Sequence, residues 1–512
     1  MNLITQIEQL LNYAVKAELM EEIDRIQMRN ALLALFSMDQ PDGELCLPEK
    51  EEEISAILNA LCDSAVQRGI IPEDTITNRD LFDTKIMGIL TPRESCVVRR
   101  FRELAKDGGP KAATDWFYFF SQSTNYIRMD RIRKNIGWET PTPYGNLMIT
   151  INLSKPELDP RDIAAAKLAK SASYPKCSIC VENVGYAGRV NAAARQNHRV
   201  IPLRLNGENW YFQYSPYIYY NEHCIVFSEA HIPMNTNVNT IRRLLEFTDL
   251  YPHYFLGSNA GLPIVGGSIL SHEHYQGGRE TLPIANAQIR RPLSWKGAPD
   301  TKISLMNWCM STLRLEGHNK EELIQTAAHI MDIWHTYTDE SVDVLDSSEV
   351  NGERVRHNAV TPIARRTADG AYQLDVVLRN NRTTEQYPYG IFHPHEELHP
   401  IKKENIGLIE VAGLAILPKR LQTELSGISD ILAGKLSVEE IFGEEHPLYK
   451  HLPFIRELQQ KYPNPKESEL PAILQQEVGL RFLEVLKTCA VFKDTPAGEA
   501  AWNRFLDAAE FV

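Results

Sequence analysis

Residues able to do chemistry gather in one short stretch, Gly266 to Gly278, which reads Gly-Gly-Ser-Ile-Leu-Ser-His-Glu-His-Tyr-Gln-Gly-Gly. Side chains on an extended strand repeat with period two, so His272, His274 and Gln276 are predicted to share one face. The glycine pairs at both ends remove side chains where a large anion would approach, and they leave amide donors to meet it. The stretch predicts a phosphate site around an imidazole nucleophile. The alternative is a strand with two surface histidines beside a glycine-rich turn.

His274 is the candidate nucleophile of this stretch. A neutral imidazole can attack phosphorus and form a phosphoramidate, if an acceptor, here expected to be a backbone carbonyl, holds its other nitrogen. Gln276 would donate its amide to a non-bridging phosphoryl oxygen, and its alternative role is that of a solvated strand residue. Glutamine at this place favours transfer between two phosphates over hydrolysis, because phosphate groups need little acid or base help at neutral pH.

A second set of residues has metal-ligand spacing. Cys177 and Cys180 form a Cys-x-x-Cys, and His231 and His272 are available to complete a Cys2His2 zinc site. Two buried cysteines or a redox pair are the alternatives, but a redox pair normally opens a helix and no helical run begins here. In the zinc interpretation the metal is structural, His272 is a ligand, and His274 stays free for chemistry.

Arginines form a third set. Arg128 and Arg131 lie in Asn125-Tyr-Ile-Arg-Met-Asp-Arg-Ile-Arg-Lys134, and Arg379 and Arg382 flank two asparagines at the end of an expected strand. Guanidinium groups suit bidentate phosphate contacts. Solvated faces are the alternative for both arginine pairs.

With these residues in view, the chain resembles the galactose-1-phosphate uridylyltransferases, and most closely the second class of that family, from Gram-positive bacteria. The stretch from Gly266 to Gly278 carries the resemblance, which extends over about residues 1 to 512. The resemblance implies a histidine-triad-like fold and ping-pong exchange of UMP between UDP-glucose and galactose 1-phosphate, in galactose metabolism by the Leloir pathway. It also implies a covalent uridylyl-histidine intermediate.

The resemblance assigns roles residue by residue. It implies that His274 is the nucleophile and Gln276 its partner, and that a structural zinc or iron, with no organic cofactor, is held by Cys177, Cys180, His231 in Phe-Ser-Glu-Ala-His and His272. Substrate contacts are expected from Asn259, Gly267, Ser268, Ser271, Arg128 and Arg131. Glu273 and Tyr275 depart from the His-Pro-His-Gly-Gln of the first class, and no role is assigned to His393 or His395.

Three other functions stay open at this point. A nucleotide hydrolase or phosphorylase of the same fold would use the same histidine. A metal-dependent hydrolase would bind its ion through both His272 and His274. A non-catalytic nucleotide-binding protein with a structural zinc would bind a UDP-sugar but would not exchange UMP.

The elements that must position these residues predict an α+β fold. The pattern predicts mostly antiparallel sheets with flanking helices after an all-α N-terminal region, and the resemblance implies that these sheets are histidine-triad-like. An internal duplication is one interpretation of the later strands. We expect a helical region at 1–112, a catalytic domain at 113–285, and a second α+β domain with C-terminal helices at 286–512. Helical periodicity and strand patterns predict the following elements. They are strands at 147–153, 200–205, 210–214, 223–227, 254–257, 262–270, 359–365, 372–379 and 406–417, and helices at 240–250 and 321–337.

Two details of these elements bear on the site. Asn206-Gly207 predicts a hairpin between two strands, and the helix at 240–250 is expected to keep Arg242 and Arg243 off its apolar side.

Composition limits the function classes. The 512 residues have a formal net charge of −13, which argues against a general nucleic-acid binder but not against a small anionic substrate. We expect no signal peptide, because the first residues lack a basic region before an apolar core, and no apolar run in the sequence is long enough to span a membrane. Eight scattered cysteines fit a reducing cytoplasm. The helical N-terminal region carries no motif and is typical of a scaffold or subunit contact, and we expect a homodimer.

Overall fold

The computed structural model of this chain describes residues 2–44, 52–154, 161–162, 166, 172–350, 352–441 and 443–512. They form two compact units. The first unit comprises Met1–Lys134 and Ser154–Ile232, and the second comprises Asn135–Leu153 and Pro233–Val512. The three domain ranges expected from the sequence stay a prediction.

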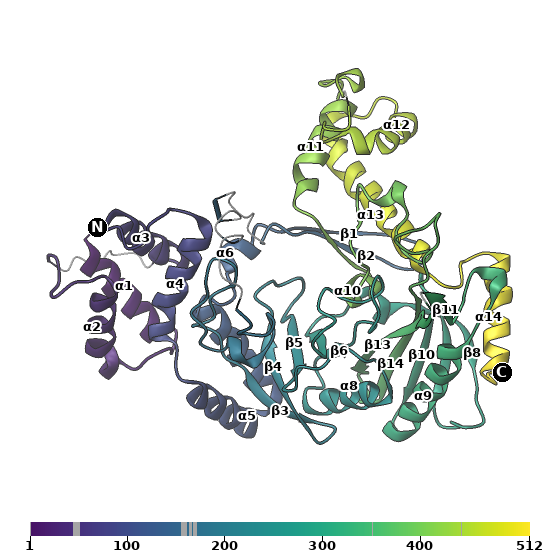
Figure 1. Ribbon diagram of the computed structural model, residues 1–512, viewed down its shortest axis with the longest axis horizontal. Coiled ribbons are helices and arrows are strands. Elements are labelled where there is room, and N and C mark those ends of the chain that lie inside the picture. Colours follow the sequence, from purple (N-terminus) through teal and green to yellow (C-terminus); the bar gives the residue numbers. More distant parts are fainter. Residues whose placement is uncertain are drawn as a thin grey trace. The chain divides into compact units, whose positions relative to one another are not determined.

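The first unit begins with helices, as the 3.6-residue periodicity of its apolar residues predicts (Figure 1). The side chain of Asn2 caps the first helix by accepting a hydrogen bond from the Thr5 N–H. The long fifth helix is interrupted at Gly109, whose φ of 80° is not helical, and it resumes at Pro110. The helices are α1 (Leu3–Lys16), α2 (Arg25–Leu35), α3 (Ile54–Gln67), α4 (Ile76–Leu90), α5 (Glu94–Ser123) and the short α6 (Met129–Ile132).

The strands of the first unit form an antiparallel meander. Its strands are β3 (Ile201–Leu205), β4 (Glu208–Tyr214) and β5 (Cys224–Ser228). Asn206 and Gly207 join the first two with positive φ values of 50° and 75°, as a two-residue turn between twisted strands requires. The predicted hairpin is confirmed.

The second unit contains a large antiparallel sheet. In spatial order its strands are β7 (His274–Gly278), β6 (Phe255–Gly257), β13 (Asn358–Arg366), β14 (Tyr372–Asn380), β10 (Thr312–Gly317), β9 (Lys302–Asn307) and β8 (Gln288–Leu293). Helices α8 (Val238–Leu250) and α9 (Lys320–Thr336) pack against each other and against β13, so they cover one face (Figure 1). The expected α+β class with a largely antiparallel sheet is confirmed.

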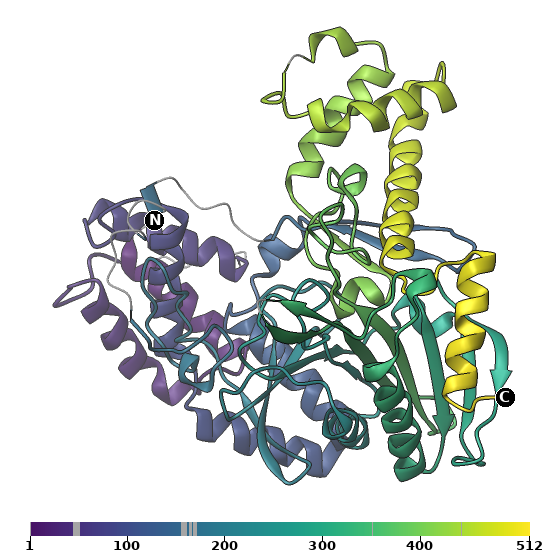
Figure 2. The same cartoon turned by 45° about the vertical axis from the view of Figure 1, so that its right-hand side comes forward.

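A smaller sheet brings together segments of the second unit that are far apart in the sequence. Strands β1 (Ile136–Thr140) and β2 (Leu147–Ile151) form an antiparallel pair, and β15 (Leu414–Leu417) runs parallel to β2. Helices follow to the C-terminus: α13 packs against β1 and β2, α11 packs against α13, and α12 packs against α11 (Figure 2). The remaining elements are the hairpin strands β11 (Ser347–Val350) and β12 (Glu353–Arg356), and helices α10 (Leu408–Val411), α11 (Arg420–Leu432), α12 (Leu452–Lys461), α13 (Leu470–Cys489) and α14 (Pro496–Ala508).

Two strand predictions are wrong. Residues 262–270 form turns, because Pro263 has no N–H to donate and Gly266 packs against backbone. A Cβ on Gly266 would lie 2.5 Å from the Ala260 carbonyl oxygen, and Ile264 takes a left-handed φ of 72°. The expected strand at 406–417 begins instead with α10, and only its last residues are extended.

The loop that replaces the expected strand changes the position of His272. The strand β7 begins at His274, so His272 precedes it, and only His274 and Gln276 share a strand face. No helix in the described part of the chain is long and apolar enough to cross a membrane.

Candidate active site and metal site

His274 is the first residue of β7 and is buried, with 5% of its surface exposed. Its Nδ1 lies 2.8 Å from the backbone carbonyl oxygen of His272. A carbonyl can only accept, so Nδ1 carries the proton and Nε2 keeps a lone pair. Among the residues that the structure describes, no hydrogen bond reaches Nε2. Burial lowers the pKa of His274 to about 4, which keeps the ring neutral.

The two residues that alternate with His272, His274 and Gln276 contact a buried arginine. Arg243 of α8 places Nη1 at 2.9 Å from Glu273 Oε1 and at 3.2 Å from the Tyr275 hydroxyl. The Tyr275 hydroxyl donates to the same Glu273 oxygen at 2.9 Å. The expectation that Arg243 lies off the buried side of its helix is wrong, because Glu273 gives its charge a buried partner. Arg242 does face outward, where it pairs with Glu321.

Asn259 links two segments beside the active-site loop. Its Oδ1 accepts a hydrogen bond from the Leu408 N–H at 2.8 Å, at the start of α10. A Cβ on Gly267 would lie 2.7 Å from Asn259 Nδ2, and one on Gly407 would lie 2.8 Å from Oδ1. Gly267 therefore lets the loop approach Asn259, in addition to any role toward an anion. Because Oδ1 is the acceptor, the amide NH2 points away from Leu408.

The other candidate substrate residues of this loop and strand differ in exposure. Ser268 and Ser271 are exposed. Gln276 is half-buried and stands opposite Gly257 in the β6–β7 pair. The two serines thus lie on a surface loop, while the side chain of Gln276 lies on the same face of β7 as that of His274.

Three of the four candidate metal ligands come together within the first unit. Cys180 Sγ lies 3.3 Å from Cys177 Sγ and 3.0 Å from His231 Nδ1, and the three ligand atoms lie within 4.8 Å of one another. Two sulfurs and an imidazole nitrogen are a donor set typical of zinc. His272, the fourth candidate, belongs to the second unit and is buried.

The cysteine pair does not have the features of a redox site. Burial and the hydrogen bond with Cys177 raise the pKa of the Cys180 thiol to about 12, so the thiol without a cation is protonated at neutral pH. After Cys180 the chain forms only a three-residue 3₁₀ turn, Val181–Asn183, instead of a helix. Asn183 donates to the carbonyl oxygens of Cys177 and Cys180 and so holds the turn. This arrangement fits a metal site better than a redox pair.

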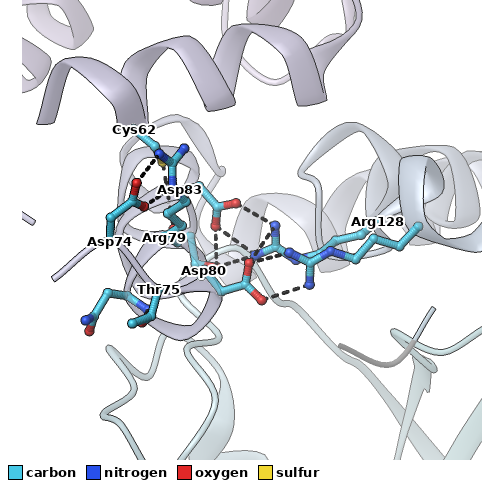
Figure 3. A network of polar contacts seen from close by, with 10 residues as sticks. Cys62, Asp74, Thr75, Arg79, Asp80, Asp83 and Arg128 are labelled. Atoms are coloured by element: carbon cyan, nitrogen blue, oxygen red, sulfur yellow. Dashed lines mark hydrogen bonds and ion pairs between the residues drawn. The ribbon is translucent and has the colours of Figure 1, made fainter. Parts of the chain in front are cut away.

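Arg128 and Arg131 both lie opposite aspartates of α4 in the first unit. Arg128 donates to both carboxylate oxygens of Asp83 at 2.5 and 2.7 Å and lies 3.5 Å from Asp80 (Figure 3). Arg131 makes a bidentate pair with Asp80 at 2.5 and 2.8 Å. Burial raises the pKa of Asp83, and the Arg128 guanidinium opposes that rise. These pairs hold α6 to α4, a structural role that the sequence did not indicate.

The same two arginines line a cavity of about 460 Å³ within the first unit. Arg195 also lines it, with its guanidinium 5.5 Å from the centre of the Tyr126 ring. Tyr126 stacks on His198 at 4.2 Å, and His198 Nε2 donates to Gln213. Polar lining residues that the sequence did not indicate include Arg189, Asn125, Asn197 and Tyr217, and the cavity is also lined by the carboxylates of Asp80 and Asp162. A cavity with an aromatic wall and several guanidinium groups suits an anionic ring-containing ligand.

The two histidines left without a role, His393 and His395, have different surroundings. His395 Nε2 donates to the Ile391 carbonyl oxygen at 3.1 Å, and its ring stacks on Tyr387. His393 is buried, and neither of its ring nitrogens has a hydrogen-bond partner in the described part of the chain. Burial lowers the pKa of His393 to about 4. This histidine is therefore neutral at physiological pH.

Comparison with known proteins gives matches along nearly the whole chain. The family model for the galactose-1-phosphate uridyl transferase N-terminal domain matches residues 18–233, and that for the C-terminal domain matches residues 246–440. A galactose-1-phosphate uridylyltransferase of Caldanaerobacter subterraneus subsp. tengcongensis is 54% identical, over 99% of this chain and 98% of its own length.

Other relatives are similarly complete. The protein of that name from Clostridium acetobutylicum is 49% identical over 98% of this chain and 99% of its own, and that from Bacillus subtilis is 45% identical over 99% and 98%. Among solved structures, yeast Ap4A phosphorylase Apa2 matches 65% of this chain and 98% of its own with a TM-score of 0.31 and 11% identity. That structural likeness is too weak to assign a fold.

Proposed function

Because this chain belongs to the galactose-1-phosphate uridyl transferase family, we propose that it exchanges UMP between UDP-glucose and galactose 1-phosphate. His274 is the nucleophile. Its Nε2 attacks the α-phosphorus of UDP-glucose, an N–P bond forms, and the P–O bond to glucose 1-phosphate breaks. A phosphate oxygen of galactose 1-phosphate then attacks the same phosphorus, the N–P bond breaks, and UDP-galactose leaves. Neither displacement needs a proton donor, because each leaving group departs as a stable anion or a neutral imidazole.

The hydrogen bond from His274 Nδ1 to the His272 carbonyl oxygen carries this proposal. It fixes the tautomer that a nucleophilic imidazole needs, and Nε2 has no hydrogen-bond partner among the described residues. The burial of the ring adds to this, because a desolvated neutral imidazole keeps its lone pair at physiological pH. Gln276, on the same strand face, would donate to a phosphoryl oxygen of the intermediate.

The substrate contacts are part of the proposal. In the second unit, the Asn259 amide NH2, which points away from Leu408, would donate to the nucleotide, while Gly267, Ser268 and Ser271 would offer backbone and hydroxyl donors. In the first unit, Arg128 and Arg131 line the cavity beside Tyr126 and Arg195. Their aspartate partners neutralise part of their charge, so we expect them to orient a phosphate group more than to attract it.

A structural metal completes the proposed site. Cys177, Cys180 and His231 would hold a zinc or iron ion, and we propose that His272 supplies the fourth ligand, since a tetrahedral site needs one more donor. With four protein ligands the bound ion cross-links the segments that carry them and offers no open position to substrate. Every chemical step above runs through His274 and the two phosphates.

The decisive experiment follows the nucleotide. The protein is mixed with UDP-glucose labelled in the α-phosphate, and the denatured chain is tested for label that acid removes and base does not, as a phosphoramidate requires. Added galactose 1-phosphate should then release the label as UDP-galactose. If the chain retains no label, or if His274→Ala retains as much as the wild type, the proposed mechanism is wrong.

The same mixture separates the rival functions. A hydrolase would release UMP without any sugar phosphate, and a phosphorylase would need only inorganic phosphate. A metal-dependent hydrolase would lose turnover at once with a chelator and would carry no covalent nucleotide. A protein that only binds nucleotide would retain UDP-glucose without any exchange.

A further inference from the structure

Two buried charged residues that take no part in the proposed steps lie next to the nucleophile. We infer that Arg243 and Glu273 are positioning residues for His274: their ion pair holds the peptide group whose carbonyl oxygen fixes the imidazole. This inference rests on the proposed function, because it assigns a role around the nucleophile of that reaction. It gives a purpose to Glu273 and Tyr275, the two residues that alternate with His272, His274 and Gln276.

The geometry follows from the alternation of a strand. Residues 274 and 276 face one side of β7, so Tyr275 faces the other, and Glu273 immediately precedes the strand. On that other side, Arg243 Nη1, Glu273 Oε1 and the Tyr275 hydroxyl form a closed triangle of contacts of 2.9 to 3.2 Å. The guanidinium of Arg243 therefore contacts both Glu273 and Tyr275, the residues on either side of His274.

The link to the nucleophile is covalent and short. The oxygen that accepts from His274 Nδ1 belongs to the peptide bond between His272 and Glu273. Anchoring the Glu273 side chain limits rotation of this peptide plane, and anchoring Tyr275 limits movement on the other side of His274. The ion pair therefore sets the direction of the hydrogen bond that selects the tautomer.

The energetics favour a positioning role over simple stabilisation. The side chains of Arg243 and Glu273 are only 7% and 5% exposed, so both charges have lost most of their hydration. A buried ion pair of this kind is often no more stabilising than well-packed apolar residues of similar volume. It does oppose slippage of the strand, since a shift by one residue would put His274 on the face of Tyr275 and would leave the charges unpaired.

The adjacent arginine provides a matched control. Arg242 occupies the same turn of α8 and makes a bidentate ion pair with Glu321 of α9, but its side chain is 30% exposed and that of Glu321 is 56% exposed. An exposed pair contributes little to stability and fixes no active-site peptide. Arg242→Met should therefore behave like the wild type, while Arg243→Met should not.

The test compares Glu273→Gln, Arg243→Met, Tyr275→Phe and the control Arg242→Met in the full-length protein. The first readout is the rate at which labelled UDP-glucose modifies His274, measured at saturating substrate in samples whose circular dichroism matches the wild type. We expect a loss of about 10- to 100-fold for Glu273→Gln and Arg243→Met, a smaller loss for Tyr275→Phe, and no loss for Arg242→Met. The KM for UDP-glucose should stay within about twofold, because neither charge binds substrate.

A second readout does not depend on turnover. Nitrogen NMR of protein labelled in histidine reports which ring nitrogen is protonated, and the His274 signal is assigned by its absence from His274→Ala. We expect a single Nδ1-protonated form in the wild type and in Arg242→Met, and a mixture of tautomers in Glu273→Gln and Arg243→Met. The double variant Arg243→Met with Glu273→Gln should lose no more rate than the worse single variant, since the two residues act as a unit.

The outcomes separate this inference from the proposed function. If the wild type forms the adduct and folded Glu273→Gln and Arg243→Met form it at the same rate, the positioning role is overturned and the proposed function stands. An unchanged tautomer in both variants also overturns it. If the KM for UDP-glucose rises while the rate at saturation is kept, the pair contacts substrate and the positioning role is again overturned. If the wild type forms no adduct, the proposed function fails and this inference fails with it.

Discussion

The Nδ1 of His274 donates a hydrogen bond to the backbone carbonyl oxygen of His272, two residues earlier in the chain, at 2.8 Å. The nucleophile proposed above is thus oriented by the segment that carries it, and not by a separate carboxylate side chain. Any change that rotates the peptide between residues 272 and 273 should change the chemistry of the ring.

Replacing His274 by alanine should abolish exchange. We expect the rate of UDP-galactose formation to fall by about 10⁴-fold or more, because the group that forms the covalent bond is removed. The measurement is initial rate together with labelling of the chain by UDP-glucose. His318→Gln, a change of an exposed histidine that lies near Asp369, is the control and should leave both unchanged. Labelling of His274→Ala at the wild-type level would contradict the prediction.

Substitution of a cysteine ligand should remove the metal but leave the proposed nucleophile, His274, in place. In Cys180→Ser, the metal content should fall from about one ion per chain to near zero, because a serine hydroxyl is a poor zinc ligand. The melting temperature should fall by several degrees, since metal binding contributes to folding. Cys96→Ser, a change of a half-exposed thiol on α5, is the control for losing a sulfur. Full metal content in Cys180→Ser would contradict the proposed ligand set.

The two arginines of the first unit should respond differently to substitution. Arg128→Ala should lower the free energy of unfolding by about 3–5 kcal/mol, because it leaves Asp83 buried without its ion pair. Arg131→Ala should cost about 1 kcal/mol or less, because Asp80 is partly exposed. Urea denaturation monitored by circular dichroism measures both.

Arg131→Ala is also the cleaner test of substrate binding, because it should stay folded. If the cavity holds substrate, the KM of this variant should rise by about tenfold or more from loss of a charge-assisted contact. Equal losses of stability in the two alanine variants, or an unchanged KM in Arg131→Ala, would contradict these expectations.

His198 should make the first unit sensitive to mild acid. Burial, with the nearby Arg195 charge, lowers the pKa of His198 from 6.5 to about 3. Between pH 6.5 and about 3, His198 is therefore protonated in the unfolded chain but neutral in the folded chain. Protonation of the unfolded chain lowers the free energy of unfolding, so the stability is highest above pH 6.5 and falls as the pH falls toward 3. His198→Gln should flatten the dependence of the urea midpoint on pH in this window. An unchanged slope in His198→Gln would contradict the assignment.

Much of the fold follows from local sequence. The Asn206-Gly207 turn, the helix at 321–337 and the strands at 359–365 and 372–379 have periodicities or turn residues that allow one structure, and they form as predicted. The strand predicted at 262–270 fails because an apolar run alone does not distinguish a strand from a packed loop. Here Pro263 and the close approach of Gly266 to Ala260 decide the outcome.

The candidate site was predictable where the chemistry demands a particular residue type. The backbone acceptor for His274 and the cluster of Cys177 with Cys180 and His231 follow from such demands. The ion pairs could not be predicted, because the chain has 67 acidic residues and nothing in the sequence tells which of them pairs with a given arginine. Arg243 looks like a solvated helix residue until Glu273 is placed beside it, 30 positions later.

The path of the chain has a consequence for biosynthesis. Strands β1 and β2 belong to the second unit but are translated before most of the strands of both units, and the parallel neighbour of β2, β15, is translated long afterwards. Until then one edge of β2 has open backbone donors and acceptors, which is the kind of surface at which nascent chains aggregate. A fragment that ends near residue 233, where the N-terminal family match ends, would keep that edge permanently. Only translation past Leu417 supplies the strand that closes it.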